Sequence, residues 1–103
     1  MTPTAHAHIV VRDDGVPMID ETTMKVVELV TEYLVDGASP EELQQSHPYL
    51  SLGQVLSALS YYWDHKAEMD ADMRRRFEYA ERMRHETPVP PGVERLRRLR
   101  SAT

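Results

Sequence analysis

The sequence predicts a mainly α-helical fold built around three helices between residues 22 and 63, and three observations support this prediction. Gly37 follows an apolar segment of helical period, at a point where a helix end favours a left-handed residue. Two capping boxes follow, one starting at Ser39 and one at Ser51. A long first helix, a short second helix and a strong third helix are the order of a helix-turn-helix unit.

The second and third helices each carry a clear start signal. Ser39 is placed as the N-cap residue, Pro40 occupies the first helical position, and Glu42 completes the capping box. Ser51 and Gln54 repeat the arrangement for the third helix. The side chains that we expect to be buried between these helices are Leu34, Leu43, Leu56, Leu59 and Trp63.

A short β-hairpin is predicted to precede the helices. The β-branched residues 9–11 and the return segment 16–19 flank a turn that ends in Asp-Gly, and Pro17 confines the second strand to an edge. Residues 1–8 are small, polar and terminal, and we expect them to be disordered. Because two strands alone are marginal in water, the hairpin must lie on the helices or pair with a second copy, which favours a homodimer.

The third helix shows no stop signal between Ser51 and Thr87. Its apolar face continues through Met73, Phe77 and Ala80. A helix of this length extends past so small a core, so this part needs a partner: the same chain folding back, a twin or another protein. The run Arg74 to Arg76 beside it is either a solvated charged face or the polar rim of an interface.

The last part of the chain is a candidate binding arm. A proline-rich break at residues 87–92 precedes the amphipathic segment 93–100, which is too short to form a stable helix alone. Such a segment either folds on a partner or stays disordered. The candidate partner-binding residues are Met73, Phe77, Ala80, Leu96, Leu99, Arg95, Arg97 and Arg98.

Charge is unevenly distributed along the 103 residues, whose net charge is -5. Residues 1–50 hold two basic and nine acidic side chains, whereas residues 70–103 hold nine arginines and six acidic side chains. An arginine-rich tail on an acidic domain indicates that the tail binds a partner that the domain does not bind. We divide the chain into residues 1–8, a hairpin and helix-turn-helix domain at residues 9–69, and a helical extension with its arm at residues 70–103.

Composition and motifs exclude several classes. The chain has no cysteine, so disulfides and thiolate metal sites are absent and a reducing cytosol suits it. No apolar run approaches the length of a membrane span and no signal peptide is recognisable, so we expect a soluble, cytoplasmic protein. His6 and His8 lack further metal ligands, and Asp70 and Asp72 cannot share a helical face. We expect no catalytic site, no cofactor and no metal.

The residues also resemble bacterial domain-of-unknown-function family 433 across residues 8–86. The segments that carry the resemblance are Val16-Pro17-Met18-Ile19, Leu34 with Gly37-Ala38-Ser39-Pro40-Glu41-Glu42, His47-Pro48-Tyr49-Leu50, and the helix with Val55, Ala58, Leu59, Tyr61 and Tyr62. One departure is that Glu21-Thr22-Thr23 stands where the family usually has Gly-Thr-Arg. The resemblance implies a homeodomain-like trihelical fold and a VapB-like antitoxin, which neutralises a PIN-like ribonuclease toxin, with repression of its own operon as a second role.

Two functional hypotheses therefore stand. The first is an antitoxin-type inhibitor that binds its toxin through the helical stripe and the arginine tail. The second is a stand-alone helix-turn-helix regulator that binds operator DNA. The face of the third helix that we expect to be exposed offers no basic group, which disfavours the second because phosphate contacts supply most non-specific affinity. That face consists of Gln54, Ser57, Ala58, Tyr61 and His65, of which Gln54, Ser57 and Tyr61 are the candidate DNA-binding residues.

Overall fold

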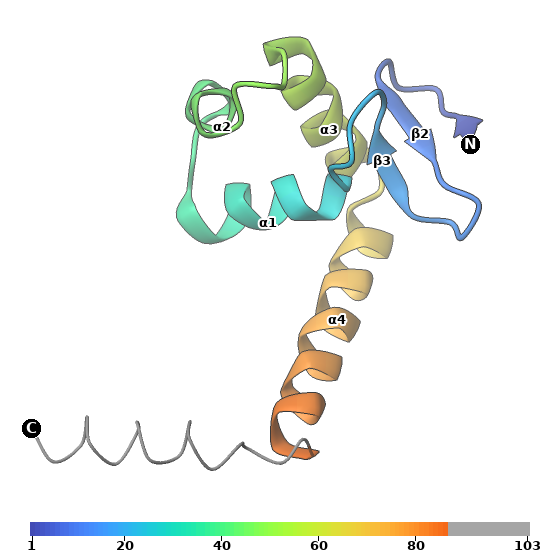
Figure 1. The fold of residues 1–103 in the computed structure, drawn as a ribbon, viewed down its shortest axis with the longest axis vertical. Helices are drawn as coiled ribbons and strands as arrows, with labels where there is room; N and C mark the ends of the chain where they lie inside the picture. Colours follow the sequence, from blue (N-terminus) through green and yellow to red (C-terminus); the bar gives the residue numbers. More distant parts are fainter. Residues whose placement is uncertain (87–103) are drawn as a thin grey trace, which may run out of the picture. The chain divides into compact units, whose positions relative to one another are not determined.

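The computed structural model describes residues 1–86, so the predictions for residues 87–103 lie outside the described part. The prediction of a mainly α-helical fold is confirmed (Figure 1). The elements are β1 (Thr2–Pro3), β2 (Ile9–Val11), β3 (Pro17–Ile19), α1 (Val26–Asp36), α2 (Pro40–Ser46), α3 (Leu52–Asp64) and α4 (Lys66–Glu86). The chain divides into two units, Met1–Met73 and Arg74–Thr103.

The three strands form one antiparallel sheet in the order β1-β2-β3. The predicted hairpin is β2 and β3, with Ile9 opposite Ile19 and Val11 opposite Pro17. Pro17 lies on an edge strand, where its missing N–H leaves no ladder bond unmade. Ile9 and Ile19 are buried, and the sheet packs on the helices through contacts of β2 with α3 and of β3 with α1.

Residues 1–8 include strand β1 and a hydrogen-bonded turn, neither of which the sequence pattern predicted. Thr2 and Pro3 pair with Val11 and Val10 of the central strand. The Thr4 hydroxyl donates a hydrogen bond to the Ile9 carbonyl at 2.8 Å. These bonds do not depend on an apolar pattern, and hydrophobic periodicity therefore missed them.

The starts of α2 and α3 are as predicted. The Glu42 N–H donates to Ser39 Oγ at 3.2 Å, and the Ser39 N–H donates to Glu42 Oε1 at 3.1 Å. The Gln54 N–H donates to Ser51 Oγ at 3.1 Å, and the Ser51 N–H donates to Gln54 Oε1 at 2.8 Å. Gly37 ends α1 in the left-handed conformation with φ 66°.

The turn between α2 and α3 is fastened to α1 by His47. Its Nε2 lies 2.5 Å from Glu32 Oε2, and its Nδ1 lies 3.0 Å from the Tyr49 hydroxyl. The Tyr49 hydroxyl also lies 3.5 Å from the sulfur of buried Met24. The His47-Pro48-Tyr49 segment therefore positions the turn against the body and has a structural role.

One hydrophobic core lies between the sheet and the helices. Leu43 and Leu59 are buried as predicted, with exposed fractions of 1% and 6%. Leu43 is the one buried residue of α2. The other core residues are Ile9, Ile19, Met24, Val26, Val27, Leu29, Val30, Leu50, Val55, Ala58, Tyr61, Tyr62 and Met69.

The prediction of burial is wrong for three residues. Leu34, Leu56 and Trp63 are exposed, with 45%, 48% and 52% of their surface accessible. The apolar arc of α3 is wider than the surface that covers it. The core takes the side of the helix that carries Val55 and Tyr62, and Leu56 and Trp63 are left on the uncovered side.

The expected single helix from residue 51 to residue 87 is interrupted at His65, which has φ −122° and ψ 30°. The His65 N–H is shared between the carbonyls of Tyr61 and Tyr62, at 3.0 and 3.1 Å. His65 Nδ1 also lies 3.0 Å from the Tyr61 carbonyl. No glycine or proline marks this break, so no local sequence signal predicts it.

After the break, the start of α4 packs on the first unit. Met69 is buried, and Met73 is half-buried beside Thr31, whose hydroxyl lies 3.8 Å from the Met73 sulfur. The Tyr62 hydroxyl donates to Asp70 Oδ1 at 2.8 Å, and Lys66 Nζ lies 2.6 Å from Asp70 Oδ2. The expectation that Met73 has no intramolecular surface to cover is therefore wrong.

Glu21 occupies a left-handed conformation with φ 64°, a region of backbone space that favours glycine. A non-glycine residue there is strained by about 1–2 kcal/mol, and glycine loses about 0.5–1 kcal/mol in chain entropy. We expect Glu21→Gly to raise the free energy of unfolding by up to about 1 kcal/mol, measured by urea denaturation. Asp20→Gly, at a neighbouring site without a positive φ, should lower it; equal effects of both changes would contradict the assignment.

Candidate protein-interaction surfaces

The outer part of α4, residues 74–86, carries apolar side chains in solvent. Phe77 is 66% exposed, and Tyr79 and Met83 are also exposed. The Arg82 guanidinium lies 6.0 Å from the centre of the Tyr79 ring, at the outer limit of a cation–π contact. This stretch of helix therefore exposes aromatic, methionine and arginine side chains, residue types that are enriched at protein interfaces, together with three glutamates.

The predicted partner-binding residues fall into three groups. Phe77 and Ala80 are exposed on α4, as expected. Met73 is half-buried in the first unit, so it serves the core as well as any partner. The residues that lie outside the described part of the chain are Leu96, Leu99, Arg95, Arg97 and Arg98.

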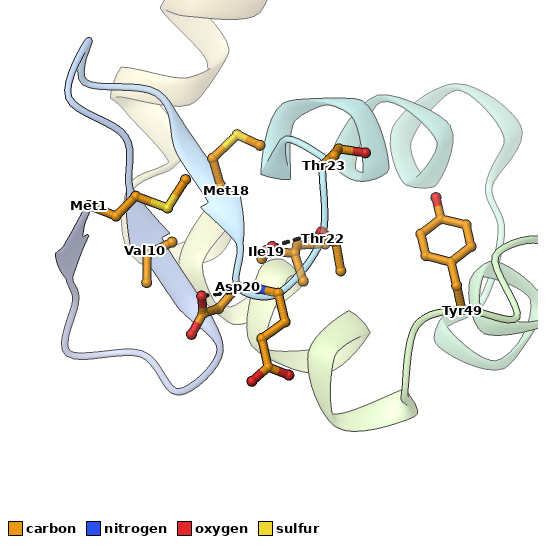
Figure 2. Close-up of a pocket in the computed structure, with 9 residues that line it drawn as sticks. Met1, Val10, Met18, Ile19, Asp20, Thr22, Thr23 and Tyr49 are labelled. Carbon is orange, nitrogen blue, oxygen red and sulfur yellow. Dashed lines mark hydrogen bonds between the residues drawn. The ribbon is translucent and has the colours of Figure 1, made fainter.

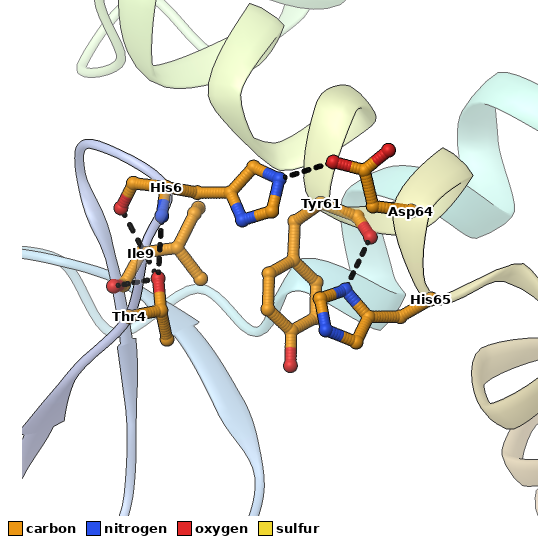
Figure 3. A network of polar contacts seen from close by, with 6 residues as sticks. All are labelled: Thr4, His6, Ile9, Tyr61, Asp64 and His65. Atoms are coloured by element: carbon orange, nitrogen blue, oxygen red, sulfur yellow. Dashed lines mark hydrogen bonds and ion pairs between the residues drawn. The ribbon is translucent and has the colours of Figure 1, made fainter.

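The α3 face that we expected to be exposed is largely covered. Ala58 and Tyr61 are buried, with exposed fractions of 0% and 8%. The N-terminal segment lies over this face: His6 Nε2 is 2.7 Å from Asp64 Oδ2, and the His6 ring meets Tyr61 edge-on (Figure 3). Tyr61 also stacks on His65, with ring centres 4.1 Å apart. Tyr61 is therefore not available to contact DNA.

The remaining DNA-binding candidates lie at the start of α3. Gln54 closes the capping box, and its side-chain amide donates to the Asp20 carbonyl at 3.3 Å. Ser57 is half-buried. Sequence reasoning missed His6 and Asp64, which hold the covering segment in place. The His6-x-His8 pattern was considered only as a possible metal site, whereas His6 contacts the carboxylate of Asp64, 58 residues away in the chain.

Part of the exposed face of α3 is apolar, next to exposed Gly53, Ser60 and Asp64. Leu52, Leu56 and Trp63 lie on one side of the helix, and we call these three residues the α3 strip. Tyr33 of α1 meets Trp63 edge-on, with ring centres 6.4 Å apart. Residues 1–73 carry three basic and thirteen acidic side chains, so the strip belongs to a strongly acidic unit.

A pocket of about 630 Å³ lies between the sheet and the loop that enters α1 (Figure 2). The residues that line it are Met1, Val10, Met18, Ile19, Asp20, Glu21, Thr22, Thr23 and Tyr49. The Thr22 hydroxyl donates to the Ile19 carbonyl at 2.7 Å, and no lining residue is a histidine, cysteine or lysine. Within residues 1–86, no group of three or more His, Cys, Asp or Glu side chains could hold a metal ion.

These features define a small, mainly α-helical domain fronted by a three-stranded sheet, with exposed apolar surfaces on two helices. The sequence model of the family described as "Protein of unknown function (DUF433)" matches residues 13–62, and this part of the chain belongs to that family. The match covers α1 and α2 and ends within α3, before α4. No curated protein and no solved structure matched the chain. Across the described residues, no helix is both long enough and apolar enough to span a membrane.

Proposed function

We propose that this chain is an antitoxin-type protein, which neutralises a PIN-like ribonuclease toxin by binding it directly. The observation that carries the proposal is the exposed Phe77, on a stretch of helix where apolar side chains lie among arginines and glutamates. Residues 74–103 hold nine arginines and four acidic side chains, opposite in sign to residues 1–73. A basic amphipathic arm on an acidic body is the composition that a partner-wrapping inhibitor needs.

The proposed inhibition follows from the chemistry of arginine. A metal-dependent nuclease holds its cation with carboxylates, and an arginine can pair with such carboxylates through two parallel hydrogen bonds. The arm would bring Arg95, Arg97 or Arg98 to that site, where it displaces or mimics the cation. Phe77 and Ala80 would supply the apolar contact that holds the arm in place.

The structure weighs against DNA binding as the main role. A homeodomain-like helix-turn-helix assignment is supported by the order of α1, α2 and α3 and by the short turn after Ser46. However, the exposed face of α3 carries the apolar strip in a unit with ten more acidic than basic side chains. Operator binding therefore enters as a second role, tested by salt-dependent affinity for the gene's own promoter. A homodimer stays a prediction, tested by light scattering.

The test is binding to the product of the neighbouring gene and inhibition of its nuclease activity. We expect Phe77→Ala to weaken binding by about 30-fold, because a buried aromatic anchor contributes about 2 kcal/mol or more. A chain truncated after Glu86 should lose inhibition. Val35→Ala, which alters an exposed residue of the first unit, is the matched control and should bind as the intact chain does.

One outcome would contradict this assignment of the arm. If the truncated chain binds and inhibits as well as the intact chain, residues 87–103 are not the inhibitory element. Inhibition would then come from the first unit or from the part of α4 around Phe77. The Phe77→Ala result separates these two cases.

A further inference from the structure

The α3 strip is a second surface, separate from the arm. At 100° per residue, Leu52, Leu56 and Trp63 lie within an arc of about 40° on one side of α3. Leu52 and Trp63 are eleven residues apart, which corresponds to roughly 16 Å along the helix axis. Isolated exposed apolar residues are normal on a protein surface, whereas an aligned ridge over three turns marks a contact surface.

The core does not need these side chains. Val55, Ala58 and Tyr62 fill the covered side of α3 and are fully buried, whereas Leu52 and Trp63 are 40% and 52% exposed. Tyr33 supports Trp63 from one side and leaves the rest of the indole accessible. Trp63 is thus a large, fixed aromatic group of the kind that anchors protein interfaces.

The charge of the unit that carries the strip, and of Asp64 beside Trp63, favours one kind of partner. Two of the three basic side chains in residues 1–73 are held by acids: Arg12 by Asp14 and Lys66 by Asp70, each at 2.6 Å. The Asp64 side chain next to Trp63 is 65% exposed even though it also holds His6. The carbonyl end of α3 adds partial negative charge at the same place. An acidic partner or DNA would be repelled, and a cationic partner would be attracted.

We infer that the α3 strip binds a basic amphipathic helix of a partner protein. Apolar residues of that helix would pack along the ridge of Leu52 and Leu56, because helices associate by fitting ridges into grooves. An arginine of the partner would lie over the Trp63 ring and pair with Asp64. This inference does not depend on the arm or on the identity of a toxin.

The chain provides its own reporter, since Trp63 is the single tryptophan of the sequence and belongs to the strip. The experiment titrates the full chain with a synthetic helical peptide of about 18 residues, which carries leucines on one face and arginines on the other. A matched peptide has glutamate at every arginine position. We expect the basic peptide to shift the Trp63 emission to the blue in a saturable manner and the acidic peptide to leave it unchanged.

Two strip variants test the location. Leu52→Ser and Leu56→Ser should each weaken binding of the basic peptide about tenfold or more, whereas Val35→Ser, at an exposed site on α1, should not. Circular dichroism should show that all three variants keep the helical content of the parent chain. Equal peptide affinity in the strip variants would overturn the assignment, as would an equal response to both peptides or no response to either.

Other occupants of the strip give different results. A blue shift that depends on protein concentration without peptide would assign the strip to a second copy of the chain and overturn the proposal. A red shift of Trp63 emission after truncation at Glu86 would assign it to the chain's own C-terminal residues, with the same consequence. Unchanged emission in both experiments, together with peptide binding, supports a separate basic partner.

Discussion

Replacement of Leu59 by alanine is expected to lower the free energy of unfolding by roughly 2–5 kcal/mol. Leu59 is 6% exposed and lies in the core between the helices, so its loss leaves a cavity that its neighbours fill only in part. Because small domains are stable by only about 5–15 kcal/mol, this is a large share of the total. Urea denaturation followed by circular dichroism measures the effect.

Leu56→Ala is the matched control, three residues away on the same helix. Leu56 is 48% exposed, so the same chemical change should lower the free energy of unfolding by less than about 1 kcal/mol. If the two variants unfold at the same urea concentration, the assignment of the covered side of α3 is wrong.

Alkaline pH is expected to unfold the first unit. Burial, followed by the hydrogen bond to Asp70, raises the pKa of Tyr62 above its ordinary value of 10.0. Burial, followed by the charge of Glu68, raises the pKa of Tyr61. A phenol whose pKa is higher in the folded state stabilises the fold fully below pH 10, and this stabilisation is lost as the pH rises through the folded pKa.

The slope of this loss is about 1.4 kcal/mol per pH unit for each tyrosine that is deprotonated in the unfolded chain and protonated in the folded one. The hydrogen bond to Asp70 also raises the pKa of Lys66. Its contribution to the stability of the fold is therefore also lost as the pH rises. Tyrosinate absorbance and circular dichroism should change together above pH 10.

Tyr62→Phe provides the control for the alkaline transition. It removes one titrating group together with its hydrogen bond to Asp70. The variant should be less stable than the parent at pH 7 and should lose less stability between pH 10 and pH 12. A parent chain that keeps its helical content while all its tyrosines ionise would contradict the burial of both rings.

The features that sequence predicted well depend on near neighbours. The capping boxes at Ser39 and Ser51 each join residues three positions apart, and the left-handed end at Gly37 follows from one residue type. The exposure of Phe77 was also predicted, because the apolar stripe continues beyond any surface the first three helices could supply. Local hydrogen bonds and helical period are properties that a sequence carries directly.

The features that sequence missed depend on distant contacts. His6 and Asp64 are 58 residues apart in the chain, and no local pattern links them, so the burial of Tyr61 could not be foreseen. The break at His65 follows from the docking of Met69 and from the Tyr62 bond to Asp70. Helical period identifies the apolar arc of a helix, but tertiary contacts decide which part of that arc is covered. Trp63 was therefore predicted to be buried, whereas it is exposed.

Residues on the two sides of the boundary between Met73 and Arg74 differ in how freely they can be substituted. The segment that belongs to the family ends at residue 62, and the first turns of α4 complete its core through Met69. Substitutions at exposed positions between residues 74 and 86 leave that core unchanged, because within the described residues 1–86 the core residues all precede Arg74. Exposed side chains on residues 74–86 of α4 can thus change while the first unit keeps its core and continues to fold.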